Sequence, residues 1–242
     1  MKTLACFAVS ISLLAGCAGM GARDEAIPLE TYRGMLASPL RLDRDKTIDE
    51  RRHAAELLQF ADVRPGMRVL DVAAGGGYTT TLLAAAVGPS GKVYAQTPNP
   101  GASLNERLAK HAEVFVLAKR PFDDPIPPEA APLDLVTLIL NYHDISYLPV
   151  DRDAMNRRIF AALRPGGHYV IVDHSALPGT GISVGKTLHR IEESFVIAEV
   201  RKAGFVLERE GTFMRNRADN LAETSEPPKQ TDKFALRFVK PR

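Results

Sequence analysis

Length and composition predict one ordinary globular domain. The chain has 242 residues, of which 45% are hydrophobic and 25% charged, so it can bury a full core. Its 31 basic and 29 acidic residues give a net charge of +2, which excludes the basic excess typical of nucleic-acid-binding proteins.

The N-terminus has the form of an export signal. Lys2 precedes an apolar stretch, residues 4–15, that is too short to span a bilayer as a mature helix. The stretch ends in Leu-Ala-Gly-Cys at residues 14–17, which resembles the bacterial lipobox, where cleavage leaves a lipid-modified cysteine. The resemblance implies a signal peptide over residues 1–16 and lipidation of Cys17. The alternative is a chance Ala-Gly-Cys after an ordinary leader.

Lipidation of Cys17 would anchor the protein in the bacterial cell envelope, because several acyl chains hold a protein stably on a membrane. Ala18, rather than aspartate, follows the cysteine, which resembles lipoproteins sorted to the outer membrane, so we expect the protein to face the periplasm. With Cys6 removed in the leader, no cysteine remains for a disulfide, a metal cluster or a nucleophile, and no metal site is predicted. Residues 17–37 would be a tether and residues 38–242 the folded domain.

The segment before the first predicted strand is charged and then helical. Residues 38–45 are dense in charge, which indicates either a solvated lead-in or a lid over a ligand. Thr47 and Glu50 fit a capping box, and apolar residues then recur with the spacing of one helical face. This pattern predicts one helix from Thr47 to Ala61, after which a Pro-Gly pair turns the chain into a strand.

A strand, a glycine turn and a helix follow. Residues 69–72 read as a buried strand, residues 75–77 are three consecutive glycines, and residues 78–87 read as a helix. Without Cβ atoms the turn tolerates positive φ and leaves room for an adenosine-type ligand beside the helix N-terminus. A dinucleotide fingerprint needs a further glycine where Thr80 stands, which weakens a nicotinamide-cofactor interpretation.

Polar residues follow the next strands at the points where they end. Residues 133–140 are nearly all apolar, as expected for a central parallel strand, and Asn141, His143 and Asp144 come directly after them. His174 follows the strand predicted at residues 168–173. Ligands in open α/β sheets bind outside the carboxyl ends of the strands, so we expect these side chains to face a ligand. For His174 a solvated loop position is the alternative.

The remaining elements complete an α/β pattern. A helix is predicted from residue 187 with Leu188, Ile191, Phe195 and Ala198 on one face, and its first residues, His189 and Arg190, could face the ligand. The charged stretch 215–232 is expected to be a mobile loop. The other predicted strands are 92–96, 114–118, 205–209 and 233–239, and the other predicted helices are 102–111 and 151–163.

Several of these segments resemble the class I S-adenosylmethionine-dependent methyltransferases. Residues 69–77, Val-Leu-Asp-Val-Ala-Ala-Gly-Gly-Gly, resemble motif I of that superfamily, and Leu-Arg-Pro-Gly-Gly at 163–167 is a further hallmark. Asn-Tyr-His-Asp, Asp-His-Ser-Ala, Thr-Leu-His-Arg-Ile-Glu and Thr-Asp-Lys-Phe resemble an exported group within it. The resemblance covers residues 38–242. It implies a single Rossmann-like seven-stranded α/β sheet with an antiparallel last strand and helices on both faces.

The resemblance also implies S-adenosylmethionine as the cofactor. By position, the cofactor-proximal residues would be Asp71, Ala73, Gly75, Gly77, Tyr78, Gln96, Asp123 and Asn141. Gln96 stands where the family usually has a ribose-binding acid, and an amide lacks the charge-assisted strength of a carboxylate. Asp123 falls near the family's adenine position, with a surface turn acid as the alternative.

Methyl transfer needs positioning and exclusion of water, and a hydroxyl or amine acceptor also benefits from a base. His143 is the first candidate base because histidine titrates near neutral pH. Asp144 would orient it or help to remove the proton, and His174 is a second candidate. The sequence therefore predicts a methyltransferase for a small-molecule or envelope acceptor. The alternative is a non-catalytic envelope binding protein that retains the fold.

Overall fold

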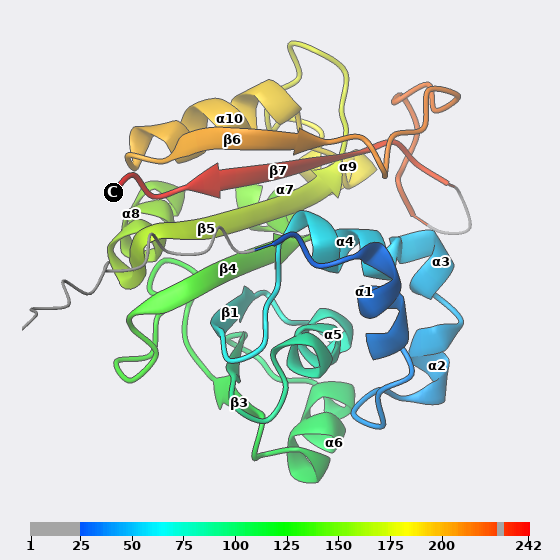
Figure 1. Cartoon of the computed structure of the whole chain (residues 1–242). Coiled ribbons are helices and arrows are strands. Elements are labelled where there is room, and N and C mark those ends of the chain that lie inside the picture. The colour runs from blue at the N-terminus through cyan, green and yellow to red at the C-terminus, as the bar shows by residue number, and fades with distance from the viewer. Residues whose placement is uncertain (1–24, 227–229) are drawn as a thin grey trace, which may run out of the picture.

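Seven strands form one sheet in the order β3-β2-β1-β4-β5-β7-β6 (Figure 1). The computed structural model describes residues 25–226 and 230–242, so the expected signal peptide and Cys17 lie outside the described residues. The strands are β1 Arg68–Val72, β2 Lys92–Gln96, β3 Phe115–Ala118, β4 Leu133–Ile139, β5 Leu163–His174, β6 Val206–Gly211 and β7 Lys233–Val239.

The strand directions confirm the predicted sheet. Strands β1 to β5 pair in parallel, whereas β7 lies between β5 and β6 and pairs antiparallel with both. The carboxyl ends of β1, β4 and β5 therefore meet at one edge of the sheet. Ligands of open α/β sheets bind at this edge.

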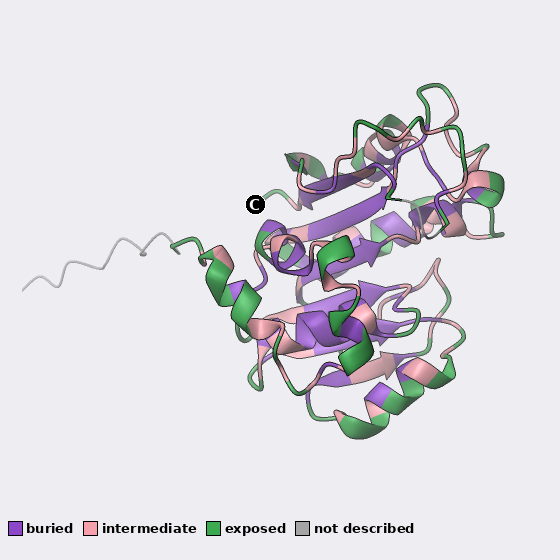
Figure 2. Ribbon diagram, turned by 90° about the vertical axis from the view of Figure 1, so that its right-hand side faces the viewer, coloured by how far each residue is buried: buried purple, intermediate pink, exposed green. Residues whose placement is uncertain are grey.

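Two apolar cores fill the spaces on either side of the sheet. Along β1, Val69 points into one core and Leu70 into the other, because successive strand residues face opposite sides. Helices α1, α4 and α5 cover the first side, and α7, α8 and α10 cover the second (Figure 1). Figure 2 shows the strands mostly buried between these layers.

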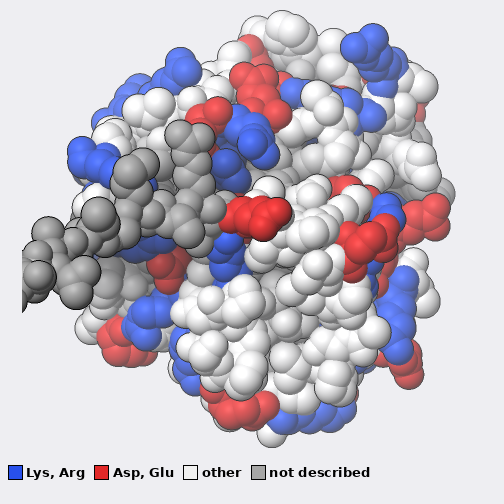
Figure 3. Space-filling model, viewed as in Figure 1, with Lys and Arg blue, Asp and Glu red and all other residues white. Residues whose placement is uncertain are grey.

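The helices span these residues: α1 Leu29–Met35, α2 Asp43–Lys46, α3 Asp49–Arg52, α4 Ala54–Phe60, α5 Tyr78–Val87, α6 Ala102–Lys110, α7 Tyr142–Ser146, α8 Arg152–Ala162, α9 Gly185–Leu188 and α10 Glu193–Lys202. None of the helices in the described part of the chain has the length and apolar character to cross a membrane. On the face seen in Figure 3, basic and acidic side chains are interspersed, in keeping with the small net charge.

The folded part begins earlier than residue 38, where the sequence placed the end of a tether. Residues 29–35 form α1, and its Tyr32 is buried, with its hydroxyl donating to the Val63 carbonyl at 3.1 Å. Ile27 and Met35 also pack against the core that α4 and α5 cover. Apolar side chains in this segment thus add a helix to the domain.

The helix predicted from Thr47 to Ala61 is broken into α3 and α4. His53 separates them with a left-handed φ of +47°. The capping box does not form, because the Thr47 hydroxyl donates to the Arg44 carbonyl. Asp49, at the start of α3, instead binds side chains from elsewhere in the fold, and these tertiary contacts override the local pattern.

The predicted helix after residue 187 is also broken. Short α9 ends at His189, whose φ is +51°, and α10 begins at Glu193. Of the predicted apolar face, Phe195 does pack against the core, but Ala198 is exposed whereas Glu199 is buried. Glu199 accepts a hydrogen bond from the Tyr142 hydroxyl at 2.6 Å, so a buried polar contact replaces the expected apolar one.

The loop between β6 and β7 is tied to the domain along its described part, although the sequence indicated a mobile segment. Arg215 pairs with Glu193 at 2.6 Å, and Asp219 pairs with the buried Arg190 at 2.9 Å. Arg190 therefore anchors this loop and does not face the ligand edge of the sheet.

Candidate functional site

The turn between β1 and α5, residues 73–77, lies at the carboxyl edge of the sheet and is called the glycine turn below. Ala73, Gly75 and Gly77 have left-handed φ values of +57°, +54° and +82°. Gly75 and Gly76 are exposed. The turn therefore presents backbone, with few side-chain atoms, at the edge where a ligand would bind.

Arg107 of α6 binds the backbone of the glycine turn. Its Nε donates to the Gly76 carbonyl at 2.9 Å, and its terminal nitrogens donate to both Asp45 oxygens at 2.7 Å. The side chains of Arg107 and Asp45 are 3% and 2% exposed, so this is a buried ion pair. The charged segment before α3 is thus packed against the turn and is not a solvated lead-in.

This segment and α3 together cover the start of α5. The Tyr78 hydroxyl donates to Asp49 at 2.8 Å, and Asp49 also pairs with Arg41. The guanidinium groups of Arg41 and Arg52 lie over the Tyr78 ring, 5.5 and 5.6 Å from its centroid. Among the described residues, no carboxylate pairs with Arg52, and its buried Nε has no hydrogen-bond partner.

Asp71 and Gln96 lie near the glycine turn and are themselves buried. Asp71 accepts hydrogen bonds from the hydroxyls of Thr80 at 2.7 Å and Thr137 at 2.9 Å. Gln96 accepts from the Ala73 N–H at 3.0 Å, and its amide donates to the Arg120 carbonyl at 2.7 Å. Both side chains therefore make hydrogen bonds within the protein, and their contacts with a cofactor stay a prediction.

Asn141 lies beside the turn, as its place after β4 predicted. Its amide donates to the Ile139 carbonyl at 2.9 Å and to the Ala73 carbonyl at 3.4 Å, so it joins the ends of β4 and β1. Asp123 is half-buried in the loop after β3. Gln96 contacts the same loop through Arg120, which puts Asp123 on the β2 side of the turn.

The burial of Asp71 predicts a pH dependence of stability. Burial raises its pKa to about 6, against the opposing hydrogen bonds of Thr80 and Thr137. Because the folded pKa lies above the unfolded value near 4, the folded state binds the extra proton. The stabilisation is complete below pH 4 and is lost as the pH rises through 6.

In wild type, Asp71 is expected to lower the free energy of unfolding by about 3 kcal/mol as the pH rises from 4 to 7, since two pKa units correspond to about that energy. In Asp71→Asn this loss should be absent, because asparagine does not ionise. Urea unfolding of both proteins at the two pH values measures this difference. Parallel pH curves for wild type and variant would show that Asp71 is ionised throughout the range.

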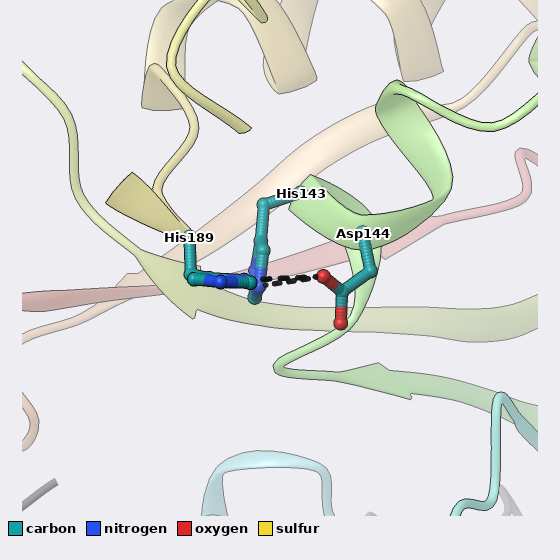
Figure 4. A group of neighbouring side chains, drawn as sticks. All are labelled: His143, Asp144 and His189. Atoms are coloured by element: carbon teal, nitrogen blue, oxygen red, sulfur yellow. Dashed lines mark hydrogen bonds and ion pairs between the residues drawn. The ribbon is translucent and has the colours of Figure 1, made fainter. Parts of the chain in front are cut away.

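Four side chains form a histidine cluster at the ends of β4 and β5: His143, Asp144, His174 and His189. The His143 ring lies 5.9 Å from that of His174 and 5.6 Å from that of His189, centroid to centroid. Asp144 lies 3.3 Å from His143 Nε2 and 3.4 Å from His189 Nδ1 (Figure 4). The structure thus brings together the three residues predicted as catalytic and adds His189.

Asp173, at the end of β5, orients His143. Its carboxylate lies 2.6 Å from His143 Nδ1 and accepts the backbone N–H groups of His143 and His174, both at 2.8 Å. Asp173 is not among the site residues predicted from the sequence. Its place beside His174, one strand away from the end of β4, is the signal that could have identified it.

Neighbouring charges and burial give His143 and His174 very different pKa values. Burial lowers the pKa of His143, but Asp173 and Asp144 outweigh it and raise that pKa to about 10. Burial, together with Lys233 and the charged His143, lowers the pKa of His174 to about 2. Asp144 is partly buried, yet its contact with His143 lowers its pKa to about 2. In the ligand-free protein at neutral pH, His143 is charged and His174 is neutral.

A cavity of about 210 Å³ borders the histidine cluster. It is called the cationic cavity because Arg51, Arg52 and Lys233 line it together with the three histidines; Leu140, Ser225, Glu226 and Thr231 complete the lining. Burial and the two arginines lower the pKa of Lys233 to about 8. The arrangement suits a small ligand that carries a negative charge.

Comparison with known proteins matches part of the chain to methyltransferases. The family model for protein-L-isoaspartate(D-aspartate) O-methyltransferase matches residues 24–100. A protein-L-isoaspartate O-methyltransferase of Aeropyrum pernix is 46% identical over 83 residues, which are 33% of this chain and 32% of that protein. A ubiquinone/menaquinone biosynthesis C-methyltransferase of Ectopseudomonas mendocina is 26% identical over 174 residues, 68% of this chain and 61% of that protein.

These matches span between about a third and three fifths of the relatives' own length. Among solved structures, a SAM-dependent methyltransferase from Aquifex aeolicus has the same fold, with a TM-score of 0.59 and 17% identity. That likeness covers 88% of this chain and 98% of the other. The fold is therefore shared along almost the whole chain, whereas the isoaspartate methyltransferase family model matches residues 24–100, which include the glycine turn.

Proposed function

We propose that this chain, a member of the class I S-adenosylmethionine-dependent methyltransferase superfamily, binds S-adenosylmethionine at the glycine turn and transfers its methyl group. The observation that carries the proposal is the turn itself, with left-handed φ at three of its residues, inside the segment that matches a methyltransferase family. When bound, the cofactor supplies a methyl group on a positively charged sulfur. Backbone without bulky side chains lets a nucleoside of this kind approach closely.

Arg52 is well placed to hold the carboxylate of the cofactor's methionine portion. Its guanidinium lies over Tyr78, the first residue of α5, and also lines the cationic cavity. A cation without an acidic partner is suited to an anionic group, because charge-assisted hydrogen bonds are the strong ones. In this arrangement α3 would hold the cofactor between the start of α5 and the cavity.

Calorimetry with S-adenosylhomocysteine tests cofactor binding. We expect saturable binding to the wild-type chain and a 10- to 100-fold weaker affinity in Arg52→Ala, the loss typical of one hydrogen bond to a charged group. Arg33→Ala, which removes an exposed arginine of α1, is the matched control and should bind normally. A thermal melt of each variant confirms folding. No binding of wild type at millimolar ligand contradicts the proposal.

The proposed acceptor site lies largely outside the segment that the isoaspartate methyltransferase family model matches. That segment ends at residue 100, whereas the three histidines of the cationic cavity all come after residue 140. We propose a small-molecule or envelope acceptor; the name of the matched family adds a protein L-isoaspartyl or D-aspartyl residue as a second candidate acceptor. The size and charge of the cavity favour a small acidic or electron-rich group. Transfer of labelled methyl to an isoaspartyl peptide would identify the protein acceptor.

A non-catalytic binding protein with the same fold is the second candidate. Gln96 favours it, because the amide replaces the expected ribose-binding acid and makes its hydrogen bonds within the protein. The calorimetry above separates the two candidates. Binding of S-adenosylhomocysteine supports the enzyme, and its absence supports the binding protein.

The leader sequence supports a further proposal, that the protein is lipidated at Cys17 and anchored to the outer membrane facing the periplasm. We expect wild type to fractionate with the membranes of a bacterial host and to carry acyl groups on its N-terminal peptide by mass spectrometry. Cys17→Ser should abolish acylation because serine offers no thiol. Equal membrane association and an unmodified peptide in both proteins would contradict lipidation.

A further inference from the structure

We propose that His143, Asp144 and His189 bind one divalent transition-metal ion at the edge of the cationic cavity. His143 and Asp144 belong to α7, and His189 follows α9, so the site joins two segments at the ligand edge of the sheet. One ligand atom from each of the three side chains lies within 4.8 Å of the other two. Figure 4 shows both imidazoles on one side of the Asp144 carboxylate.

The spacing of these atoms suits a metal ion. Two ligand atoms at about 2.1 Å from a metal, separated by a tetrahedral angle, lie about 3.4 Å apart. Asp144 Oδ1 lies 3.3 Å from His143 Nε2 and 3.4 Å from His189 Nδ1. An ion placed among the three atoms would thus require small side-chain rotations and would displace the proton of His143 Nε2, since metal binding releases ligand protons.

The hydrogen-bond partners of the other ring nitrogens of His143 and His189 also favour metal binding. Nδ1 of His143 faces the buried Asp173 at 2.6 Å, and Nε2 of His189 faces Glu226 at 3.5 Å. Each imidazole therefore has a carboxylate at the nitrogen that points away from Asp144. In metal sites this arrangement fixes the tautomer and directs the other nitrogen's lone pair at the metal. The Tyr147 hydroxyl further orients Asp144 through a 2.9 Å hydrogen bond.

The donor set indicates the class of metal. Two imidazole nitrogens and one carboxylate oxygen suit first-row ions such as Zn²⁺, Co²⁺, Fe²⁺ or Ni²⁺, whereas Mg²⁺ and Ca²⁺ prefer oxygen ligands throughout. Three protein ligands leave a coordination position open, as in catalytic rather than structural sites. Asp144, Asp173 and Glu226 supply three negative charges around the ion.

The open position would face the ligand of the cationic cavity, since all of His143, His189 and Lys233 line it. Given the proposed function, an oxygen of the acceptor would occupy this position, and Arg51, Arg52 and Lys233 would balance its charge. The acceptor is then an acidic oxygen compound. Only this role rests on the proposed function, because metal binding itself needs neither cofactor nor acceptor.

Cobalt titration of the full chain after removal of metals by a chelator tests the site. We expect one equivalent of Co²⁺ to bind with visible absorption bands of a nitrogen- and oxygen-ligated ion, and Zn²⁺ to displace it. His189→Ala should weaken binding at least 100-fold, and Glu226→Gln about 10-fold, the usual effect of losing an outer carboxylate. His111→Ala is the matched control, because His111 also lies near a glutamate, 3.6 Å away, but outside the cluster.

Absence of stoichiometric Co²⁺ and Zn²⁺ uptake by wild type, or equal uptake by His189→Ala and wild type, would overturn the proposal. A melting curve of each variant without metal shows that the fold persists. A separate calorimetric titration of the metal-free chain with S-adenosylhomocysteine measures cofactor binding on its own. Failure of the metal proposal and failure of the proposed function are therefore distinguishable.

Discussion

Replacement of Arg107 by alanine is expected to lower the free energy of unfolding by about 3–5 kcal/mol. The substitution leaves the Asp45 carboxylate buried without its cation, and it also removes the hydrogen bond that holds the Gly76 carbonyl. An uncompensated buried charge is costly because neither water nor a partner stabilises it. Urea unfolding followed by circular dichroism at neutral pH measures the loss.

Arg44→Ala provides the matched control for this variant. Arg44 also links the segment before α3 to α6, through Ser103 at 2.9 Å and Glu106 at 3.2 Å. Its side chain is 54% exposed, so water replaces the lost contacts and we expect a change below about 1 kcal/mol. Similar losses in the two variants would show that the buried ion pair has no special role in holding the turn.

Replacement of Gly77 by alanine is expected to cost about 2–5 kcal/mol of stability. Its φ of +82° is unfavourable for a residue with Cβ, at about 1–2 kcal/mol. The new methyl would also meet Arg107 Cδ at 2.8 Å and Leu104 Cδ1 at 3.0 Å, and overpacking adds about 1–3 kcal/mol. Arg107 cannot move aside cheaply, because Asp45 and the Gly76 carbonyl hold its guanidinium.

Gly75→Ala separates the two contributions. Gly75 also has a left-handed φ, +54°, but the nearest atom to an added Cβ is the Ala73 carbonyl oxygen at 3.8 Å. We expect only the conformational cost of about 1–2 kcal/mol in this variant. Equal unfolding free energies for the two variants would contradict the predicted clash at Gly77.

Local patterns were sufficient for the elements on which the sheet depends. Residues 78–87 and 92–96 are a helix and a strand with the predicted bounds, because glycines flank the helix at both ends, and a glycine before the strand and a proline soon after it mark the strand. The breaks at His53 and His189 have no such local mark, since neither residue is a glycine or proline. Distant contacts fix them; the His189 carbonyl, for example, accepts a hydrogen bond from Ser225.

The site was predictable where it depends on topology and unpredictable where it depends on side-chain direction. His143, Asp144 and His174 meet because neighbouring parallel strands end at one edge of the sheet. That rule says nothing about which strand-end side chains turn inward. Gln96 and Asp71 do turn inward, and their hydrogen bonds to Ala73 and to Thr80 and Thr137 are the reason.

Helix α3 has only four residues, yet it contacts both the start of α5, next to the glycine turn, and the cationic cavity. Arg52 stacks on Tyr78 beside the glycine turn, and Arg51 and Arg52 line the cationic cavity. Under the proposed function, sequence changes in this one helical turn would therefore shift the affinities for methyl donor and methyl acceptor together, and the two preferences would evolve as a coupled pair.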